Sequence, residues 1–170
     1  EQPEGSDLDV RLTKNVAFLT CGSEWVFERK SERRVLKRSI DELLNLGCTV
    51  FSVSFVQRVN VSTVASSLKR HIRKSTEVGG IQHTASTICM WLPSFGKHVA
   101  SKPIKQESAL CMPSLQMVAH LFDTAAGNVL IIPAVWPPME PWSIQDVFMC
   151  VQANVKALHW DVQWMLIGGA

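Results

Sequence analysis

The sequence has no tyrosine, few charged residues and no long hydrophobic run. No apolar stretch approaches the roughly 18 residues that a membrane-spanning helix needs, so we expect no membrane insertion. Charged residues make up 19% of the chain and hydrophobic residues 46%, a balance typical of a folded domain. A length of 170 residues suits one domain with a substantial core. We therefore expect a polar linker over residues 1–13 and a single domain over 14–170.

The short motifs of nucleotide binding, acyl transfer and zinc binding are also missing. The sequence contains no GxGxxG, no GxxxxGKS/T and no GxSxG. Its five cysteines form no CxxC pair, and its five histidines form no i, i+4 pair. The odd number of cysteines excludes a fully paired set within the chain, although one or two disulfides stay open. We predict no catalytic residue, no metal ion and no cofactor.

Strand patterns alternate with helix patterns along the chain. Short apolar or β-branched runs predict buried strands over 15–21, 49–56, 128–135 and 162–167. Apolar residues at helical spacing predict helices over 31–46, 62–74, 115–122 and 143–158. Residues 87–92 fit a strand or a helical turn, and residues 93–106 read as a loop. This alternation predicts an α/β fold, a Rossmann-like three-layer α/β/α arrangement with a mostly parallel central sheet.

In this order, the elements resemble a von Willebrand factor A domain, and those of the collagen VI chains most of all. Residues 14–25 resemble the family's first strand and its DxSxS metal motif, and residues 49–55 resemble its second strand. Residues 79–84 resemble the Gly-Gly turn before a metal-binding threonine. Residues 129–136 and 162–169 resemble the late strand-helix-strand unit.

The metal positions depart from that family. The chain has Cys21, Ser23 and Trp25 at the DxSxS positions, and Trp136 with two prolines where the family has an acidic turn. Ser23 and Thr84 alone remain of the expected ligands, whereas Mg²⁺ needs carboxylate and water oxygens. The resemblance thus implies a degenerate adhesion site without metal, in a non-enzymatic interaction module of a secreted extracellular-matrix protein. Its partners would be proteins, other matrix chains above all, with Trp25 and Trp136 as candidate contacts.

An enzyme remains the alternative. An intracellular Rossmann-like enzyme acting on a nucleotide or ester would place a polar pocket at the strand ends and keep its cysteines reduced. Ser23 with His159 and Asp161 would then be its candidate nucleophile, base and acid.

Basic residues crowd the stretch from Arg29 to Lys74, although a net charge of +2 is too small to predict nucleic-acid binding. A local anion-binding face for a glycosaminoglycan or phosphate is one interpretation, with candidates Arg33, Arg34, Lys69 and Arg70. The solvated faces of two helices are the commoner origin of such a band, and a nucleic-acid surface also stays open. Asn60 begins the N-glycosylation sequon Asn60-Val61-Ser62, which mildly favours a secreted chain.

Overall fold

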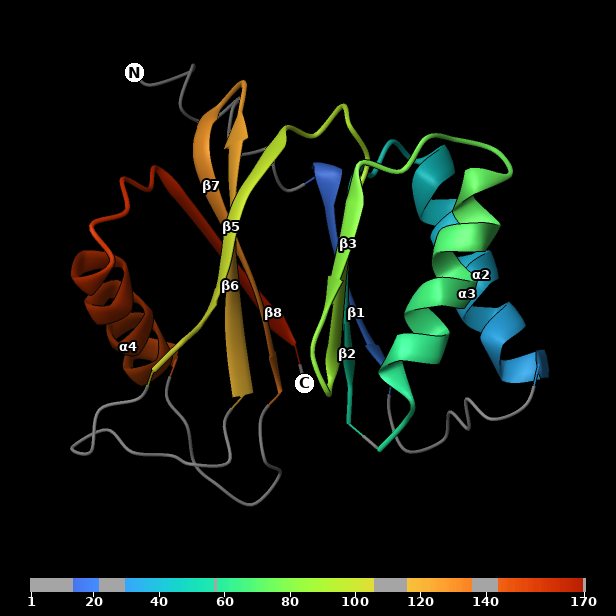
Figure 1. Ribbon diagram of the computed structural model, residues 1–170, viewed down its shortest axis with the longest axis horizontal. Helices are drawn as coiled ribbons and strands as arrows, with labels where there is room; N and C mark the ends of the chain where they lie inside the picture. Colours follow the sequence, from blue (N-terminus) through green and yellow to red (C-terminus); the bar gives the residue numbers. More distant parts are fainter. Residues whose placement is uncertain (1–13, 22–29, 57, 106–115, 136–143, 170) are drawn as a thin grey trace.

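The computed structural model describes residues 14–21, 30–56, 58–105, 116–135 and 144–169. Within them, two four-stranded sheets lie face to face, and helices cover the two outer faces (Figure 1). The layer order is α/β/β/α, and four of the six strand pairs are antiparallel. The predicted three-layer architecture with one mostly parallel sheet is therefore wrong.

The first sheet has the strand order β1-β2-β4-β3. β1 (Val16–Cys21) and β2 (Val50–Phe55) are parallel and joined through α2 (Lys30–Asn45). β4 (Thr87–Trp91) pairs antiparallel with both β2 and β3 (Gly80–His83). α3 (Val61–Arg73) lies beside α2 on the outer face of this sheet.

Both predicted helices of this half are confirmed, and their apolar stripes explain their position. Leu36 and Ile40 of α2 are fully buried against the sheet, as are Leu68 and Ile72 of α3. Asn60 caps α3 by accepting a hydrogen bond from the Thr63 N–H at 3.2 Å. Asn is among the residues that best satisfy the open N–H groups of a helix start.

The second sheet has the strand order β5-β6-β7-β8. β5 (Lys97–Pro103), β6 (Gln116–Thr124) and β7 (Gly127–Val135) follow one another as antiparallel neighbours. β8 (Trp164–Gly169) is parallel to β7 and joined to it through α4 (Ile144–Ala157), which covers the outer face. A loop over 93–106 and a helix over 115–122 were therefore wrong predictions, because β5 and β6 occupy these stretches.

The sequence of β6 wrongly predicted a helix because this strand is buried on both faces. Ala119 and Phe122, which share a face only in a helix, lie on opposite faces of the strand. Ala119 belongs to the core beneath α4, and Phe122 belongs to the core between the two sheets. A strand with apolar residues on both faces has no clean alternation, so its sequence also fits helical spacing.

Gly80 is part of β3 and not of the expected Gly-Gly turn, and its missing side chain makes room for the Trp91 indole. A Cβ added at Gly80 would overlap the Trp91 indole, with its Cε2 only 2.9 Å away. Trp91 cannot move away easily, because its indole is stacked on His98 with ring centroids 4.7 Å apart.

We therefore expect Gly80→Ala to destabilise the fold by about 2 kcal/mol, as overpacking does in a close-packed interior. Urea denaturation of the variant and the wild-type protein measures the difference. Adding Trp91→Phe should recover part of that loss relative to Trp91→Phe alone. Equal effects of Gly80→Ala in both backgrounds would show that the indole is not the cause.

Candidate functional site

Several strand ends and a hairpin meet at one end of the sandwich. In the first sheet, the Val56 N–H donates to the Cys21 carbonyl at 3.0 Å, and the Phe55 N–H donates to the Ser86 carbonyl at 2.8 Å. In the second sheet, the Ile104 N–H donates to the Met117 carbonyl at 3.0 Å, where β5 ends and β6 begins. The ends of β1, β2 and β5 thus share this end with the start of β6 and with the β3–β4 hairpin.

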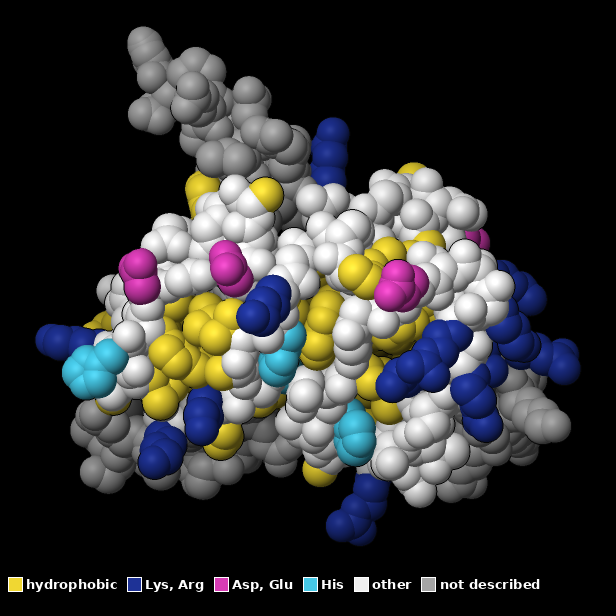
Figure 2. Space-filling model, turned by 45° about the horizontal axis from the view of Figure 1, so that its top comes forward, with side chains coloured by type: hydrophobic (Ala, Val, Ile, Leu, Met, Phe, Trp, Pro, Cys, Tyr) yellow, Lys and Arg dark blue, Asp and Glu magenta, His cyan; other side chains and the backbone are white. Residues whose placement is uncertain are grey.

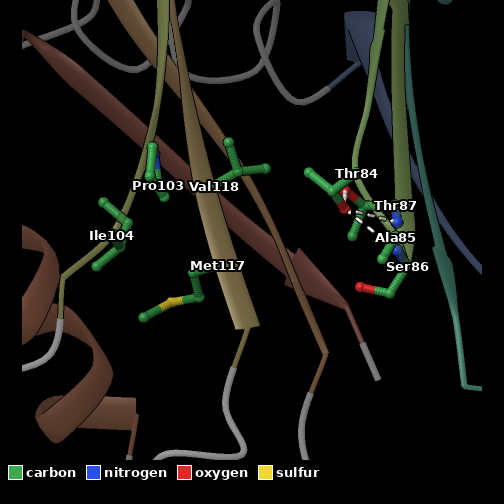
Figure 3. A pocket seen from close by; sticks show the side chains of 8 residues that line it. All are labelled: Thr84, Ala85, Ser86, Thr87, Pro103, Ile104, Met117 and Val118. Carbon is green, nitrogen blue, oxygen red and sulfur yellow. Dashed lines mark hydrogen bonds between the residues drawn. The ribbon is translucent and has the colours of Figure 1, made fainter.

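A pocket of about 510 Å³ opens between the two sheets at this end. Its polar wall comes from the hairpin between β3 and β4, with Thr84, Ser86 and Thr87 (Figure 3). The other lining residues are apolar and come from β5, β6 and the residue that follows β5: Pro103, Ile104, Met117 and Val118. Val118 points toward the hairpin, whereas Ile104 and Met117 point to the α4 side and belong to the core beneath that helix. The volume falls within the range of small-molecule sites, which combine an apolar lining with a few placed polar groups. We call it the strand-end pocket.

The hydroxyl groups of Thr84 and Thr87 form an ordered pair in this wall. Thr84 Oγ1 accepts hydrogen bonds from the Ser86 N–H at 3.2 Å and from the Thr87 N–H at 3.0 Å. These use both lone pairs of the oxygen, so its own proton goes to Thr87 Oγ1, which lies 2.8 Å away. No described residue accepts the remaining Thr87 proton, although Thr87 is only 2% exposed. The Thr87 hydroxyl is therefore a polarised donor in the pocket wall.

A second polar cluster lies deeper between the sheets. Ser101 pairs with His120 across β5 and β6, two positions from the Pro103–Val118 pair of the pocket and on the same face. Ser101 Oγ lies 2.7 Å from His120 Nδ1 and 2.7 Å from His98 Nε2. His98 stacks on Trp91, and His120 is 1% exposed with no partner for Nε2 among the described residues.

Burial keeps both imidazoles neutral. Desolvation, with a smaller contribution from nearby His98, lowers the pKa of His120 to about 4. Desolvation also lowers the pKa of His98, against a hydrogen bond with the Ala100 backbone that raises it. At neutral pH, each ring can therefore accept one hydrogen bond and donate another, as the shared serine requires.

The candidate residues of the sequence fall in different places. Thr84 lines the strand-end pocket, and Cys21 is 2% exposed at the end of β1, at the same end of the sandwich. Ser23, Trp25 and Trp136 lie outside the described residues. His159 and Asp161 precede β8, at the opposite end of the sandwich from Cys21, where the Asp161 carbonyl accepts from Asn128 Nδ2 at 2.8 Å.

The predicted anion-binding residues lie on the outer helix layer. Arg33 and Arg34 are on α2, and Lys69 and Arg70 are on α3. The sequon residue Asn60 is exposed but already serves as the cap of α3 through Oδ1. Its glycosylation stays a prediction.

Sequence reasoning missed the hydroxyl pair and the serine between two histidines. Thr87, Ser101 and His120 carry no motif spacing, and the strand pairing of β5 with β6 alone brings two of them together. The sequence singles out only Thr84, as a remnant of a metal site.

Neither a metal cluster nor a membrane span is found in the described part of the chain. No group of three or more His, Cys, Asp or Glu side chains there could hold a metal ion. No helix there is long and apolar enough to cross a membrane. Cys48 and Cys89 are buried thiols outside any disulfide, and burial raises the pKa of both.

Solved structures with a similar arrangement of layers identify the fold. The human Nocturnin catalytic domain with a bound sulfate anion matches with a TM-score of 0.54 and 12% identity, over 83% of this chain and 57% of that one. The fold resembles that of the endonuclease/exonuclease/phosphatase proteins. A protein of that family from Leptotrichia buccalis matches with a TM-score of 0.52 and 11% identity, over 89% and 64% of the two chains. A humanized D. rerio TDP2 matches with a TM-score of 0.50, 11% identity and the same coverage.

The chain spans less than two thirds of each of these structures, and its sequence is only 11% to 12% identical to theirs. No protein-family model matches the sequence, and no curated protein matches it. The similarity therefore concerns the fold of these endonuclease/exonuclease/phosphatase proteins.

This similarity overturns the von Willebrand factor A resemblance. That resemblance required a central parallel sheet with helices on both faces, whereas here a second sheet covers the inner face of the first. The predicted function in collagen VI-like matrix assembly and adhesion depended on the resemblance and is wrong with it. The alternative of an enzyme acting on a nucleotide or ester agrees better with the observed fold.

Proposed function

We propose that this chain binds phosphate esters in the strand-end pocket. The observation that carries the proposal is the pairing of a polarised hydroxyl wall with an apolar wall, between the two sheets of an endonuclease/exonuclease/phosphatase-like fold. The similar Nocturnin catalytic domain holds a bound sulfate, which supports the choice of a tetrahedral anion. The family name of the Leptotrichia protein points to the same substrate class.

The two walls suit the two parts of such a ligand. The Thr87 hydroxyl accepts the Thr84 proton and keeps its own proton to donate to a phosphoryl oxygen. The Ala85 N–H belongs to the same hairpin and makes no hydrogen bond with the described residues. Pro103 and Val118, which pair across β5 and β6, can cover the organic group of the ester. Hydrogen bonds to a charged acceptor are shorter and stronger than bonds between neutral groups.

We expect adenosine monophosphate to bind with at least tenfold higher affinity than adenosine, which has the same base but no phosphate. Thr87→Val keeps the side-chain shape and removes the donor, so it should weaken binding of the nucleotide about tenfold, as loss of a hydrogen bond to a charged group does. An NMR titration of the labelled protein gives both affinities and locates the shifts. They should concentrate at Thr84 to Thr87, Met117 and Val118.

Thr63→Val is the matched control, because Thr63 is exposed at the start of α3 and distant from the pocket. It should leave the affinity for the nucleotide unchanged within twofold. Shifts spread elsewhere, or equal affinities for nucleotide and nucleoside, would refute a phosphate site in this pocket.

Phosphodiester hydrolysis is a second candidate, favoured by the similarity of the fold to a catalytic domain, that of human Nocturnin. The described residues offer no metal-ligand cluster for it, and the expectation of a non-enzymatic chain stays a prediction. Hydrolysis of bis(p-nitrophenyl) phosphate, measured with Mg²⁺ or Mn²⁺ and then with EDTA, separates the two. Turnover that Thr87→Val lowers and Thr63→Val does not would make the chain an enzyme; binding without turnover would make it a recognition domain.

A further inference from the structure

Positive charge is concentrated in the layer formed by α2 and α3. Between Lys30 and Lys74, the chain has ten Lys and Arg residues and three Asp and Glu residues, a net charge of +7. The whole chain has a net charge of +2, which leaves −5 for the rest of it. The small overall charge therefore hides a strong separation of charge within one domain.

Six basic side chains of this layer define what we call the basic helix face: Arg34, Arg38, Lys69, Arg70, Arg73 and Lys74. All are exposed except the half-buried Lys69. Figure 2 shows Lys and Arg side chains gathered on the side of the molecule where α2 and α3 lie. The two helices run side by side, so their basic residues belong to one surface.

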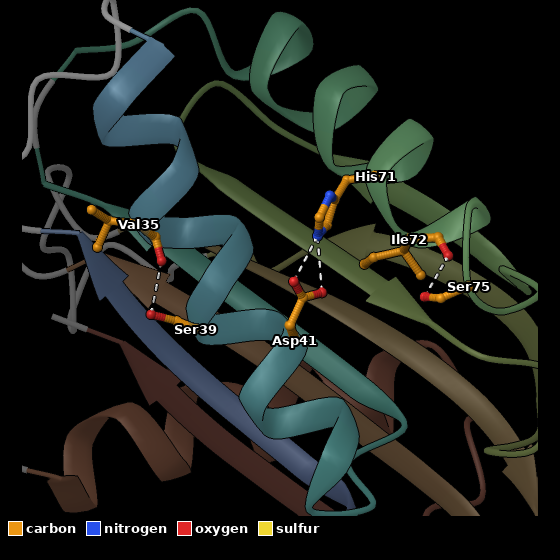
Figure 4. A network of polar contacts seen from close by, with 6 residues as sticks. All are labelled: Val35, Ser39, Asp41, His71, Ile72 and Ser75. Atoms are coloured by element: carbon orange, nitrogen blue, oxygen red, sulfur yellow. Dashed lines mark hydrogen bonds and ion pairs between the residues drawn. The ribbon is translucent and has the colours of Figure 1, made fainter.

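The acidic side chains that the structure describes form no ion pair with this face. Asp41 of α2 is hydrogen-bonded to His71 of α3, whose Nε2 lies 2.9 and 3.0 Å from the two carboxylate oxygens (Figure 4). The chain has no Asp or Glu between Glu42 and Glu77. None of the six residues of the basic helix face forms an ion pair with a described residue. Ordinary solvated helices intersperse Glu and Lys at i, i+4. Here Glu42 follows Arg38 at that spacing but forms no ion pair with it, and α3 has no acidic residue.

From this uncompensated charge we infer that the basic helix face binds the phosphate backbone of a nucleic acid. A polyanion gains free energy there by releasing its condensed counterions when basic side chains replace them. The basic residues form i, i+4 pairs on both helices, Arg34 with Arg38 and Lys69 with Arg73, each separated by about 6 Å along the helix axis. Such rows suit a linear polymer with repeated charges better than a single small anion.

Arginine and the strand-end pocket decide the kind of polymer. Four of the six residues are arginines, whose planar guanidinium binds phosphate through two hydrogen bonds. A sulfated glycan would meet the same charges, so the choice of a phosphate polymer rests on the proposed function. A nucleic acid carries the phosphate esters that we assign to the strand-end pocket, and the basic helix face would raise its local concentration near the protein.

The test is fluorescence anisotropy of a labelled single-stranded DNA oligonucleotide at several salt concentrations. Reversing three charges of the face together (Arg34→Glu, Arg38→Glu and Arg70→Glu) should weaken binding at least tenfold. It should also reduce the slope of log affinity against log salt by about 2, because each phosphate contact on a single strand contributes roughly 0.7. Circular dichroism checks that the variant is folded.

The matched control reverses the same number of charges on the other half of the molecule, with Lys97→Glu, Lys102→Glu and Lys156→Glu. It changes the net charge equally and should keep the affinity for DNA within about threefold. Equal losses in both variants would reduce the effect to net charge, and absence of DNA binding by the wild-type protein would overturn the inference. Binding of the protein to heparin without binding to DNA would overturn the inference too. The variant with three reversed charges should bind adenosine monophosphate as tightly as the wild-type protein does. This parallel measurement tests the strand-end pocket separately from the basic helix face.

Discussion

Replacing Phe122 with alanine is expected to lower the free energy of unfolding by about 4 kcal/mol, the size of a large-to-small change in a core that cannot collapse. Phe122 is fully buried between the two sheets. Its ring contacts three aromatic neighbours edge to face: Trp91 at 5.0 Å, Phe95 at 5.1 Å and His98 at 5.4 Å. Trp91 and Phe95 are themselves buried and packed, so neither can readily fill the space that the ring leaves.

Urea denaturation followed by circular dichroism measures this loss. Phe148→Ala is the matched control, since Phe148 on α4 is 40% exposed and should cost less than about 1 kcal/mol. A typical domain has a stability of about 5 to 15 kcal/mol, so the Phe122 variant should be close to unfolding while the control stays folded. Similar effects of the two substitutions would mean that the inter-sheet core does not hold the sheets together.

The two strand-helix-strand units could be predicted from the sequence, and the way they pack could not. β1 and β2 flank α2, and β7 and β8 flank α4, where the apolar runs and helical stripes predicted them. A strand such as β7 is buried on both faces whether a helix or another sheet covers its second face. The same apolar run therefore fits a three-layer and a four-layer fold.

The antiparallel half of each sheet carried weaker signals. β5 alternates half-buried and exposed residues at an edge, and Gly96 and Pro103 at its ends made it resemble a loop. β3 has only four residues, and one of them, Gly80, has no side chain because the Trp91 indole occupies that space. Without these strands, the remaining pattern reads as a parallel sheet.

The candidate sites depended on contacts that no spacing encodes. The Thr84–Thr87 pair spans the three-residue turn between β3 and β4, so its local hydrogen bonds could be inferred, but its position opposite Val118 required the packing of the sheets. Ser101 and His120 are 19 residues apart and meet through strand register. The basic helix face, in contrast, was visible as a cluster of basic residues in the sequence, and the structure adds that its residues have no acidic partners among those described.

Acidification should destabilise the fold of this protein through His120. The group has a pKa of about 4 in the folded chain and an ordinary value near 6.5 when exposed. The folded state therefore binds fewer protons than the unfolded state between these two values, and stability falls as the pH falls from about 6.5 to about 4. A difference of about 2.5 pKa units corresponds to about 3 kcal/mol, and the lowered pKa of His98 acts in the same direction.

Denaturation curves at several pH values from 7 to 4 measure this loss. His120→Gln keeps a polar partner for Ser101 without titrating, so its stability should decline by about 2 to 3 kcal/mol less than that of the wild-type protein over the same range. His159→Gln is the control, because His159 is exposed beyond α4 and should leave the decline unchanged. Carboxylates also weaken a fold in acid, and only the difference between these two variants isolates the buried imidazole. Equal declines in all three proteins would show that His120 takes up its proton without leaving the inter-sheet core, so that the cluster with Ser101 tolerates a charge that desolvation should forbid.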